Sequence, residues 1–280
     1  MPALQTTAIL LRSVDFGESD RILHLLVPES GRLTAIAKGA RRSVRRFSGT
    51  LDLFNHLRVQ IDRRREGAMA RLDQAVLIRA FSPLRTQPAR FALGCYLLEL
   101  LDRLAPEGGA RADTQRLFAF SLRALAAAAE RPADARLRLF LELQALDLLG
   151  LRPELARCVR CGAEPRSAPR IGFHVAEGGP LCSACGRGAE GVLEVHAGTL
   201  RALELLLRLD EDRLARLVLP AAGLEEAREL LERFQRFHLG IELRSEPFLD
   251  AQLARARRDP TPYTAAASKS NPESRMAGPT

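Results

Sequence analysis

Four of the five cysteines form two pairs, each with two residues between its members. The first pair is Cys158 and Cys161, the second pair is Cys182 and Cys185, and twenty residues lie between the two pairs. This spacing is close to that of structural zinc sites, in which two knuckles place four thiolates about 2.3 Å from one tetrahedral ion. Four thiolates leave no open coordination position, so we predict one structural Zn²⁺ and no catalytic metal.

A pair of reduced thiols or a dithiol redox site is the alternative. A redox pair usually opens a helix beside a strand, whereas these pairs flank a stretch rich in Gly and Pro. That stretch is too poor in apolar residues to form its own core, which favours a metal. His174 lies between the pairs and could compete as a ligand, although four cysteines leave no vacancy. Cys95 lies in an apolar helical run, where a lone cysteine is typically a small core residue.

A second group of residues that could bind a ligand is a run of positively charged side chains with no acidic residue among them. The run spans residues 38–46 and contains Lys38, Arg41, Arg42, Arg45 and Arg46. Unpaired charges are too costly to bury, so these side chains face water or an anion. A solvated loop is the simpler interpretation. A position directly after a strand of a small β-domain favours a phosphate-binding loop.

The charge of the whole chain is concentrated at the same end. The net charge is +8, and residues 1–80 hold 14 Lys and Arg against 8 Asp and Glu. Such asymmetry is expected of a domain that meets a polyanion. Arg21 and the turn Arg63–Arg65 are secondary candidates for the same surface. Aromatic residues are scarce, so we expect charge to outweigh base stacking, with Phe47 and Phe54 as the stacking candidates.

The elements that position the basic run are strands. Alternating apolar residues and turn signals predict five of them, at Ala8–Val14, Asp20–Val27, Leu33–Lys38, Leu53–Asp62 and Ala68–Ala80. Five short strands in one small domain predict a closed or nearly closed barrel, and the OB-fold is the obvious candidate because it binds nucleic acid on one face.

The rest of the chain has helical periodicity. We predict helices at Phe91–Leu104, Ala112–Glu130, Ala133–Leu149, Thr199–Leu209, Glu211–Val218 and Leu224–His238. The fold class is therefore α+β. We expect an OB-fold domain at 1–80, a helical domain at 81–250 with the zinc motif inserted at about 155–190, and a disordered tail at 251–280.

No catalytic motif is present: the sequence lacks a Walker loop, a GxGxxG fingerprint, an HExxH helix and a GxSxG elbow. Asp15, Glu18 and Asp20 could hold Mg²⁺ in a nuclease, but acids in turns mostly cap backbone amides or stay solvated. No apolar run is long enough to span a bilayer and no signal peptide begins the chain. We expect a cytoplasmic binding protein that is not an enzyme and does not bind membranes.

The stretch DFGESDRILHLLVPESGRLTAIAKGARRSVRRFSGTLDLFN, residues 15–55, resembles the bacterial RecO family of recombinational repair proteins. That family has a YGE-x-D turn, a strand, a glycine turn, and then AKGARR with a basic loop. Phe16 stands here in place of the tyrosine. The resemblance is specific over the first 55 residues, moderate at the cysteines and weak in the helices.

The resemblance implies an OB-fold followed by a helical domain with a four-cysteine zinc motif. It also implies a non-catalytic mediator that binds single- and double-stranded DNA, anneals complementary strands, contacts single-stranded-DNA-binding protein, and with RecR helps to load RecA. Such a protein would be cytoplasmic and associated with the nucleoid during repair. The DNA-binding residues would be Lys38, Arg41, Arg42, Arg45, Arg46 and Arg21. The alternative is an OB-fold RNA-binding factor with a structural zinc site.

Overall fold

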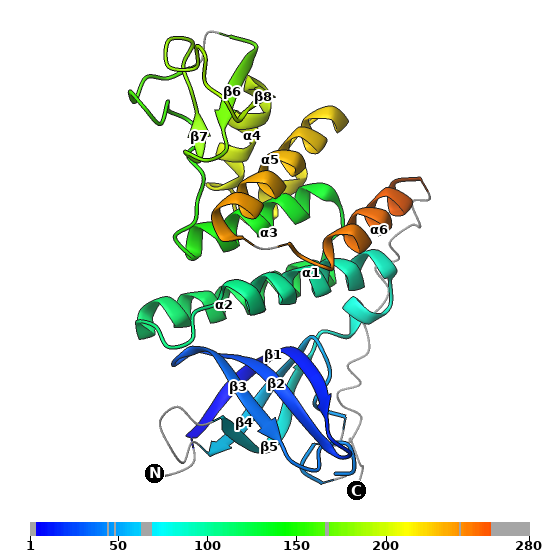
Figure 1. Ribbon diagram of the computed structural model, residues 1–280. Coiled ribbons are helices and arrows are strands. Elements are labelled where there is room, and N and C mark those ends of the chain that lie inside the picture. Colours follow the sequence, from blue (N-terminus) through cyan, green and yellow to red (C-terminus); the bar gives the residue numbers. More distant parts are fainter. Residues whose placement is uncertain are drawn as a thin grey trace, which may run out of the picture.

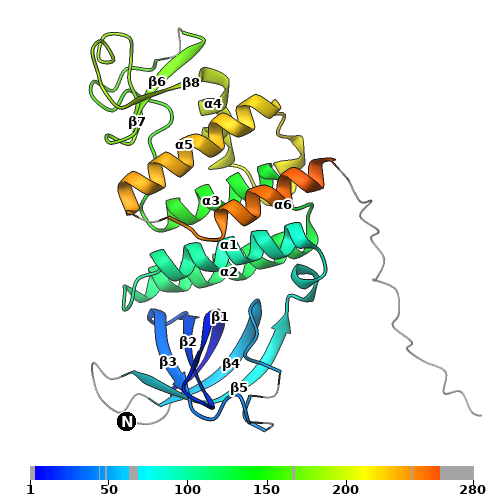
Figure 2. The ribbon, with the colours of Figure 1, turned by 45° about the vertical axis from the view of Figure 1, so that its right-hand side comes forward.

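The computed structural model describes residues 4–43, 45–47, 49–62, 69–165, 168–240 and 242–258. The molecule is elongated, with a β-barrel at one end, stacked helices in the middle and a small sheet at the other end (Figures 1 and 2). The basic run lies in the barrel and the cysteine pairs lie beside the small sheet.

The barrel consists of the five strands that the sequence predicts. They are β1 (Leu4–Phe16), β2 (Asp20–Val27), β3 (Gly31–Ala37), β4 (Asn55–Asp62) and β5 (Ala70–Ala80). The sheet closes in the order β1-β2-β3-β5-β4, an OB-like arrangement. All pairs are antiparallel except a short parallel contact between β3 and β5 at Ala35–Ala70 and Ile36–Arg71. The prediction of a closed five-stranded barrel is confirmed.

Alternation along each strand produces the barrel interior. In β3 every second residue from Gly31 to Ala37 is buried, which places one face inside and the other toward solvent. The interior cluster is largely aliphatic, with Phe47 as an aromatic member, and includes Ala8, Leu10, Leu23, Leu25, Ala35, Leu57 and Val59. Ala35 and Ala37 are fully buried at the end of β3, and the basic run leaves the barrel directly after them.

The helical domain comprises six α-helices in the described part of the chain and a three-stranded sheet of order β7-β6-β8. The helices are α1 (Pro88–Leu104), α2 (Arg111–Glu130), α3 (Ala135–Leu148), α4 (Ala197–Leu206), α5 (Ala221–Leu239) and α6 (Glu246–Arg258). Two 3₁₀ turns, η1 (Ser82–Arg85) and η2 (Glu211–Arg216), precede α1 and α5. The sheet strands are β6 (Arg170–His174), β7 (Gly179–Pro180) and β8 (Val192–His196).

Two predictions need correction. Residues 251–258, which we expected in a disordered tail, form the second half of α6. This helix was missed because it is short and Arg-rich, and only Leu249 and Leu253 are buried, one turn apart. The helix expected at Glu211–Val218 is the 3₁₀ turn η2. Residues 259–280 lie outside the described part of the chain.

The barrel and the helical domain share one hydrophobic core. Ile9, Leu26 and Phe54 from the barrel belong to the same buried cluster as the helices. Helices α1 and α2 lie across the end of the barrel (Figure 2). Backbone hydrogen bonds from Arg32 N to Pro106 O (2.8 Å) and from Gly108 N to Ser30 O (2.8 Å) add to this contact. No helix in the described ranges is long and apolar enough to cross a membrane.

Candidate nucleic-acid interface and metal centre

The basic loop, residues 38–46, is held against the turn between β1 and β2. Gly39 has a left-handed backbone, with φ of 67°, which favours glycine. Its amide donates to Asp20 Oδ1 at 2.7 Å, and Arg41 N donates to Ser19 O at 3.0 Å. The Gly39 amide is the main cause of the lowered pKa of Asp20. Asp20 therefore fixes the start of the loop.

Two acids beside the turn between β1 and β2 form ion pairs with three arginines. Asp15 lies 3.1 Å from Arg21 Nε and 3.6 Å from Arg41 Nε. Glu18 lies 3.7 Å from Arg42 Nη2. The sequence shows no acid within the basic run, and these partners come from the neighbouring hairpin. All of these pairs are partly or largely exposed, so they are weak and an anion can compete with them.

The remaining basic residues differ in role. Lys38 and Arg45 are exposed, and neither has an ion-pair partner among the described residues. Arg46 donates from Nη2 to Lys38 O at 2.6 Å, and its guanidinium lies 5.0 Å from the centre of the Phe47 ring. Arg46 thus closes the loop as well as adding charge. The turn Arg63–Arg65 lies outside the described residues.

The aromatic candidates for stacking are both buried. Phe47 is 4% exposed and Phe54 is fully buried. Phe54 fills the barrel end, where its ring packs edge-on against Phe91 with centroids 5.6 Å apart. A Cβ on Gly94 would lie 2.7 Å from the Phe54 ring, so only glycine fits there without movement of that ring. Phe16, beside Asp15, is exposed in this region at 52%, and no pattern in the sequence indicated it as a stacking residue.

The four cysteines form one cluster. Their Sγ atoms all lie within 4.8 Å of one another, and those of Cys161 and Cys182 are 3.6 Å apart. Four sulfurs at about 2.3 Å from a tetrahedral ion are about 3.8 Å apart, so this arrangement fits a metal. The sequence prediction that these four cysteines come together is confirmed.

The surrounding contacts fix the first knuckle and favour the thiolate form of Cys158. Glu154 Oε1 accepts from the amides of Leu155, Ala156 and Arg157 at 3.0, 2.7 and 3.1 Å, which fixes the turn that leads to Cys158. Burial raises the pKa of the Cys158 thiol, but hydrogen bonds from backbone amides, that of Cys182 foremost, outweigh it and lower the pKa to about 6. A thiol held as thiolate near neutral pH is suited to bind a cation.

His174 does not belong to the group of metal-binding side chains, and its ring contacts Glu177 instead. Its Nδ1 accepts from Glu177 N at 3.1 Å, and its Nε2 lies 3.6 Å from the Glu177 carboxylate. Arg160 binds that carboxylate at 2.6 Å and donates to Cys185 O at 2.9 Å. Glu177 and Arg160 therefore connect β6 to the second knuckle, and His174 belongs to this shell of contacts.

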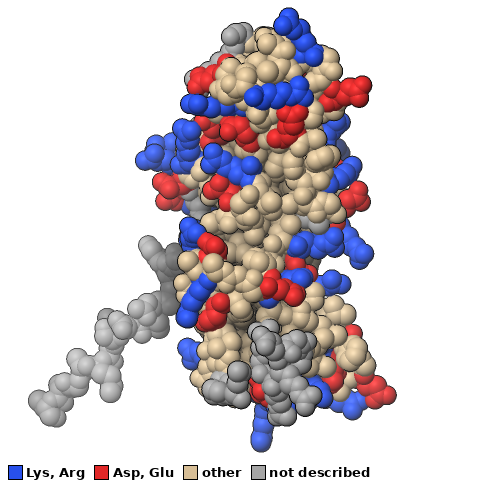
Figure 3. Space-filling model, turned by 60° about the vertical axis from the view of Figure 1, so that its left-hand side comes forward, with Lys and Arg blue, Asp and Glu red and all other residues tan. Residues whose placement is uncertain are grey.

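The cysteine cluster and the basic loop lie at opposite ends of the molecule (Figure 1). In the part of the chain that the structure describes, the four cysteines form the one group of three or more metal-binding side chains. Asp15, Glu18 and Asp20 face arginines or the Gly39 amide and form no such group. On the face drawn in Figure 3, the helical domain carries interspersed positive and negative side chains.

These features define a class of protein: an OB-like barrel with a basic loop, joined to a helical domain that carries a four-cysteine cluster. Comparison with known proteins narrows the class. Residues 1–81 match the model of the family Recombination protein O N terminal, and residues 85–247 match Recombination protein O C terminal.

Relatives extend this match over most of the chain. The DNA repair protein RecO of Anaeromyxobacter dehalogenans (strain 2CP-C) is 41% identical over 253 residues, covering 89% of this chain and 97% of the relative. The protein of that name from Myxococcus xanthus (strain DK1622) is 37% identical over 242 residues, covering 86% and 95%. That from Geobacter sulfurreducens is 35% identical over 251 residues, covering 89% and 98%. The chain belongs to the RecO family of DNA repair proteins, with a role in recombination repair.

Proposed function

We propose that this chain is a non-catalytic mediator that binds single- and double-stranded DNA through the basic loop and anneals complementary strands. With RecR it helps to load RecA onto DNA coated by single-stranded-DNA-binding protein. The observation that carries the proposal is the exposure of Lys38, Arg42 and Arg45 at the end of β3. Side chains of this kind neutralise phosphates and leave base edges free for pairing.

One structural Zn²⁺ is part of the proposal. Cys158, Cys161, Cys182 and Cys185 would hold it, and it would supply no chemistry beyond cross-linking the two knuckles. The distance of the cluster from the basic loop supports a role in folding the helical domain. A content of one zinc per chain in the purified protein, lost with Cys158→Ser/Cys161→Ser, is the expected result.

Annealing of complementary oligonucleotides without a nucleotide cofactor tests the function. The wild type is compared with Arg41→Ala/Arg42→Ala/Arg45→Ala/Arg46→Ala at two salt concentrations. A control with the same loss of charge is Arg116→Ala/Arg201→Ala/Arg208→Ala/Arg233→Ala, whose arginines are exposed on the helical domain. We expect wild-type and control annealing that weakens with salt, and a large loss in the loop variant.

A loop variant that anneals as well as the control would mean that the loop is only solvated. Absence of annealing by every protein would favour the second candidate, an RNA-binding factor. Equal competition by RNA and DNA for the same surface would identify that candidate. Metal-dependent strand cleavage abolished by Asp20→Ala would show a nuclease, although the Asp20 carboxylate is already bound to the Gly39 amide.

A further inference from the structure

A cleft of about 420 Å³ lies between the barrel and the helical domain. Its apolar residues are Leu11 of β1, Leu53 from the segment before β4, and Leu98 of α1. Three arginines line it as well, and each comes from a different part of the chain. Arg12 lies on β1, Arg103 near the end of α1, and Arg244 in the segment that leads to α6.

The three arginines are available to a ligand. Arg12, Arg103 and Arg244 are all exposed. None has an ion-pair partner within 4 Å in the part of the chain that the structure describes. Most of the arginines around the α5–α6 contact, by comparison, face carboxylates, as Arg228 does with Glu225 and Glu232. The cleft therefore combines an apolar surface with unpaired positive charge.

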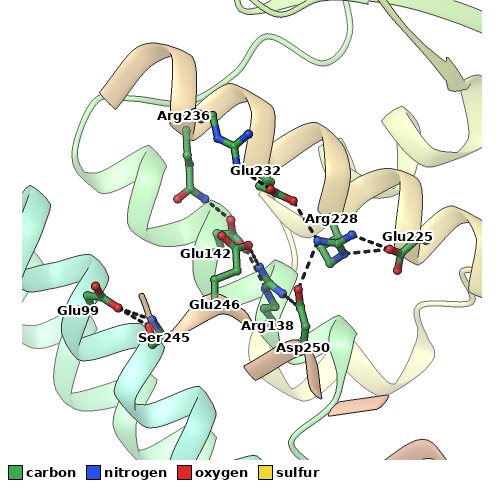
Figure 4. A network of polar contacts seen from close by, with 11 residues as sticks. Glu99, Arg138, Glu142, Glu225, Arg228, Glu232, Arg236, Ser245, Glu246 and Asp250 are labelled. Atoms are coloured by element: carbon green, nitrogen blue, oxygen red, sulfur yellow. Dashed lines mark hydrogen bonds and ion pairs between the residues drawn. The ribbon is translucent and has the colours of Figure 1, made fainter. Parts of the chain in front are cut away.

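The two acids that line the cleft are engaged by the protein itself. The Glu99 carboxylate accepts from the amides of Arg244 and Ser245 at 2.9 and 2.8 Å and from Ser245 Oγ at 2.5 Å (Figure 4). Asp102 is 5% exposed and is bound by side chains from the barrel, His24 and Arg32. Their two negative charges offset part of the positive charge of the three arginines, and Arg103 helps to lower the pKa of Glu99. The lining keeps an excess of positive charge, and its exposed side chains are the arginines.

The cleft is continuous with the basic loop. Arg21 Nη1 lies 3.5 Å from Leu51 O, and the chain reaches Leu53 in the cleft two residues later. On β1, Asp15 pairs with Arg21 and Arg12 pairs with His24, so Arg12 lies three residues farther along the same hairpin and on its other face. Three residues of strand span about 10 Å, which is within reach of neighbouring phosphates on one strand of nucleic acid.

We infer that this cleft is a second contact site for single-stranded nucleic acid, which takes the strand from the basic loop onto the helical domain. Arg12, Arg103 and Arg244 contact phosphates, and an unstacked base packs on Leu11, Leu53 and Leu98. The inference rests on the proposed function and adds a site for it. An acidic peptide with an apolar end is the other ligand of matching chemistry, and continuity with the loop favours nucleic acid.

Binding of fluorescent single-stranded DNA of two lengths tests the inference. The cleft variant is Arg12→Gln/Arg103→Gln/Arg244→Gln, and the control Arg123→Gln/Arg201→Gln/Arg255→Gln removes the same charge from exposed positions outside the cleft. An oligonucleotide of about 4 nucleotides is at the lower limit of what a single OB fold covers and can occupy the loop alone, and one of about 30 is long enough to fill both the loop and the cleft. Dissociation constants are measured over a range of salt concentrations.

We expect the cleft variant to bind the long strand about tenfold more weakly than the control and to bind the short strand equally well. The slope of log K against log salt for the long strand should fall by about 2, because each lost phosphate contact on a single strand removes about 0.7. Equal slopes for the two variants would overturn the inference. Unchanged DNA binding with loss of binding to a synthetic acidic peptide ending in Phe would assign the cleft to a peptide.

Cys95 gives a direct second readout because it is half-buried among the cleft residues. Burial, and then the charge of Glu99, raises the pKa of its thiol to about 11, so free disulfide reagents react slowly. A strand that carries a pyridyl disulfide on one base would place the reagent beside it. Attack by the Cys95 thiolate forms the protein–DNA disulfide and releases thiopyridone.

Capture of the long strand by wild type and not by Cys95→Ser is the expected result. Equal capture by both proteins would place the DNA elsewhere. These outcomes separate the inference from the proposed function. An unchanged salt slope in the cleft variant, beside weakened DNA binding in the loop variant, would overturn the inference alone, whereas no DNA binding by wild type would overturn both.

Discussion

His24 of β2 and Asp102 of α1 meet across the junction between the barrel and the helical domain, with His24 Nδ1 2.5 Å from Asp102 Oδ1. Arg32 of β3 donates to the main-chain carbonyl of Asp102 at 3.0 Å and lies 3.6 Å from its carboxylate. A buried acid whose partners all come from the other domain ties the two domains together at a set angle.

Substitution Asp102→Ala should therefore lower the free energy of unfolding. It leaves His24 and Arg32 without their shared partner, and because both are partly exposed we expect a loss of about 2 kcal/mol, below the 3–5 kcal/mol of fully buried pairs. Urea denaturation of the variant and of wild type measures this loss of stability. Asp113→Ala is the control, since Asp113 is exposed and pairs with Arg116 within its own helix. Equal losses in the two variants would contradict a special role for this contact.

Under the proposed function, Asp15 competes with DNA for Arg21 and Arg41. Its carboxylate is 54% exposed, so its ion pairs add little to stability, and a phosphate must displace it. We expect Asp15→Asn to raise DNA affinity several-fold at low salt, with the difference shrinking as salt rises. The control is Glu107→Gln, an exposed acid paired with Arg32 away from the loop. A fall in affinity would show instead that Asp15 positions the arginines for DNA.

The barrel and the cysteine cluster were predictable because their signals are local. Alternation in GRLTAIA determines which face of β3 is buried, and the spacing of Cys158 and Cys161 already specifies a knuckle. The partners of the basic loop were not predictable in this way. Asp15 and Arg41 meet only because β1, β2 and β3 close into one barrel, which brings a turn and a loop together.

The burial of the aromatic residues was likewise not predictable from the local sequence. Phe47 and Phe54 follow the basic run in sequence and suggested stacking, yet both are buried. Phe54 has φ of 66°, a conformation that turns its ring into the shared core against Gly94. Phe16 is exposed because the end of β1 extends past the barrel interior. Local sequence does not distinguish these cases, since burial depends on how the barrel end meets α1.

Removal of the proposed zinc ion should affect folding and leave the proposed DNA binding intact. We expect Cys158→Ser/Cys161→Ser, or treatment with a chelator, to lower the melting temperature, because a site that binds only the folded state adds its binding free energy to stability. The folded fraction should keep its DNA affinity, since the cluster lies at the far end from the loop (Figure 1). Cys95→Ser is the control and should leave the response to chelator unchanged. Lost affinity at unchanged stability would instead place the cluster in the DNA interface.

Arg138 of α3 is at the centre of a buried polar network between the helices (Figure 4). It is 2% exposed and binds the carboxylates of Glu246 and Asp250 on α6. Its guanidinium lies 4.9 Å from the ring centre of Tyr96 on α1. Glu142 is 3.6 Å from Arg138 and accepts from Gln235 of α5. Every helix that packs here contributes a polar group.

Glu142 should make stability depend on pH near neutrality. Burial raises its pKa from 4.5 to about 7, although Arg138 opposes the shift. The folded protein therefore holds this proton more tightly than the unfolded chain does. The resulting stabilisation is complete below pH 4.5 and is lost as the pH rises through 7, about 2–3 kcal/mol between pH 5 and pH 8.

Glu142→Gln tests this, because a glutamine keeps the shape of the side chain and stays neutral. Denaturation curves at pH 5 and pH 8 measure the free energy of unfolding. Between these pH values, that of the variant should rise by about 2–3 kcal/mol relative to that of wild type. The control is Glu232→Gln on α5, whose carboxylate pairs with Arg228 and Arg236 and is partly exposed. If wild type and Glu142→Gln lose stability in parallel, Glu142 is ionised in the folded protein throughout, and the network is a set of ion pairs in which Arg138 outweighs burial.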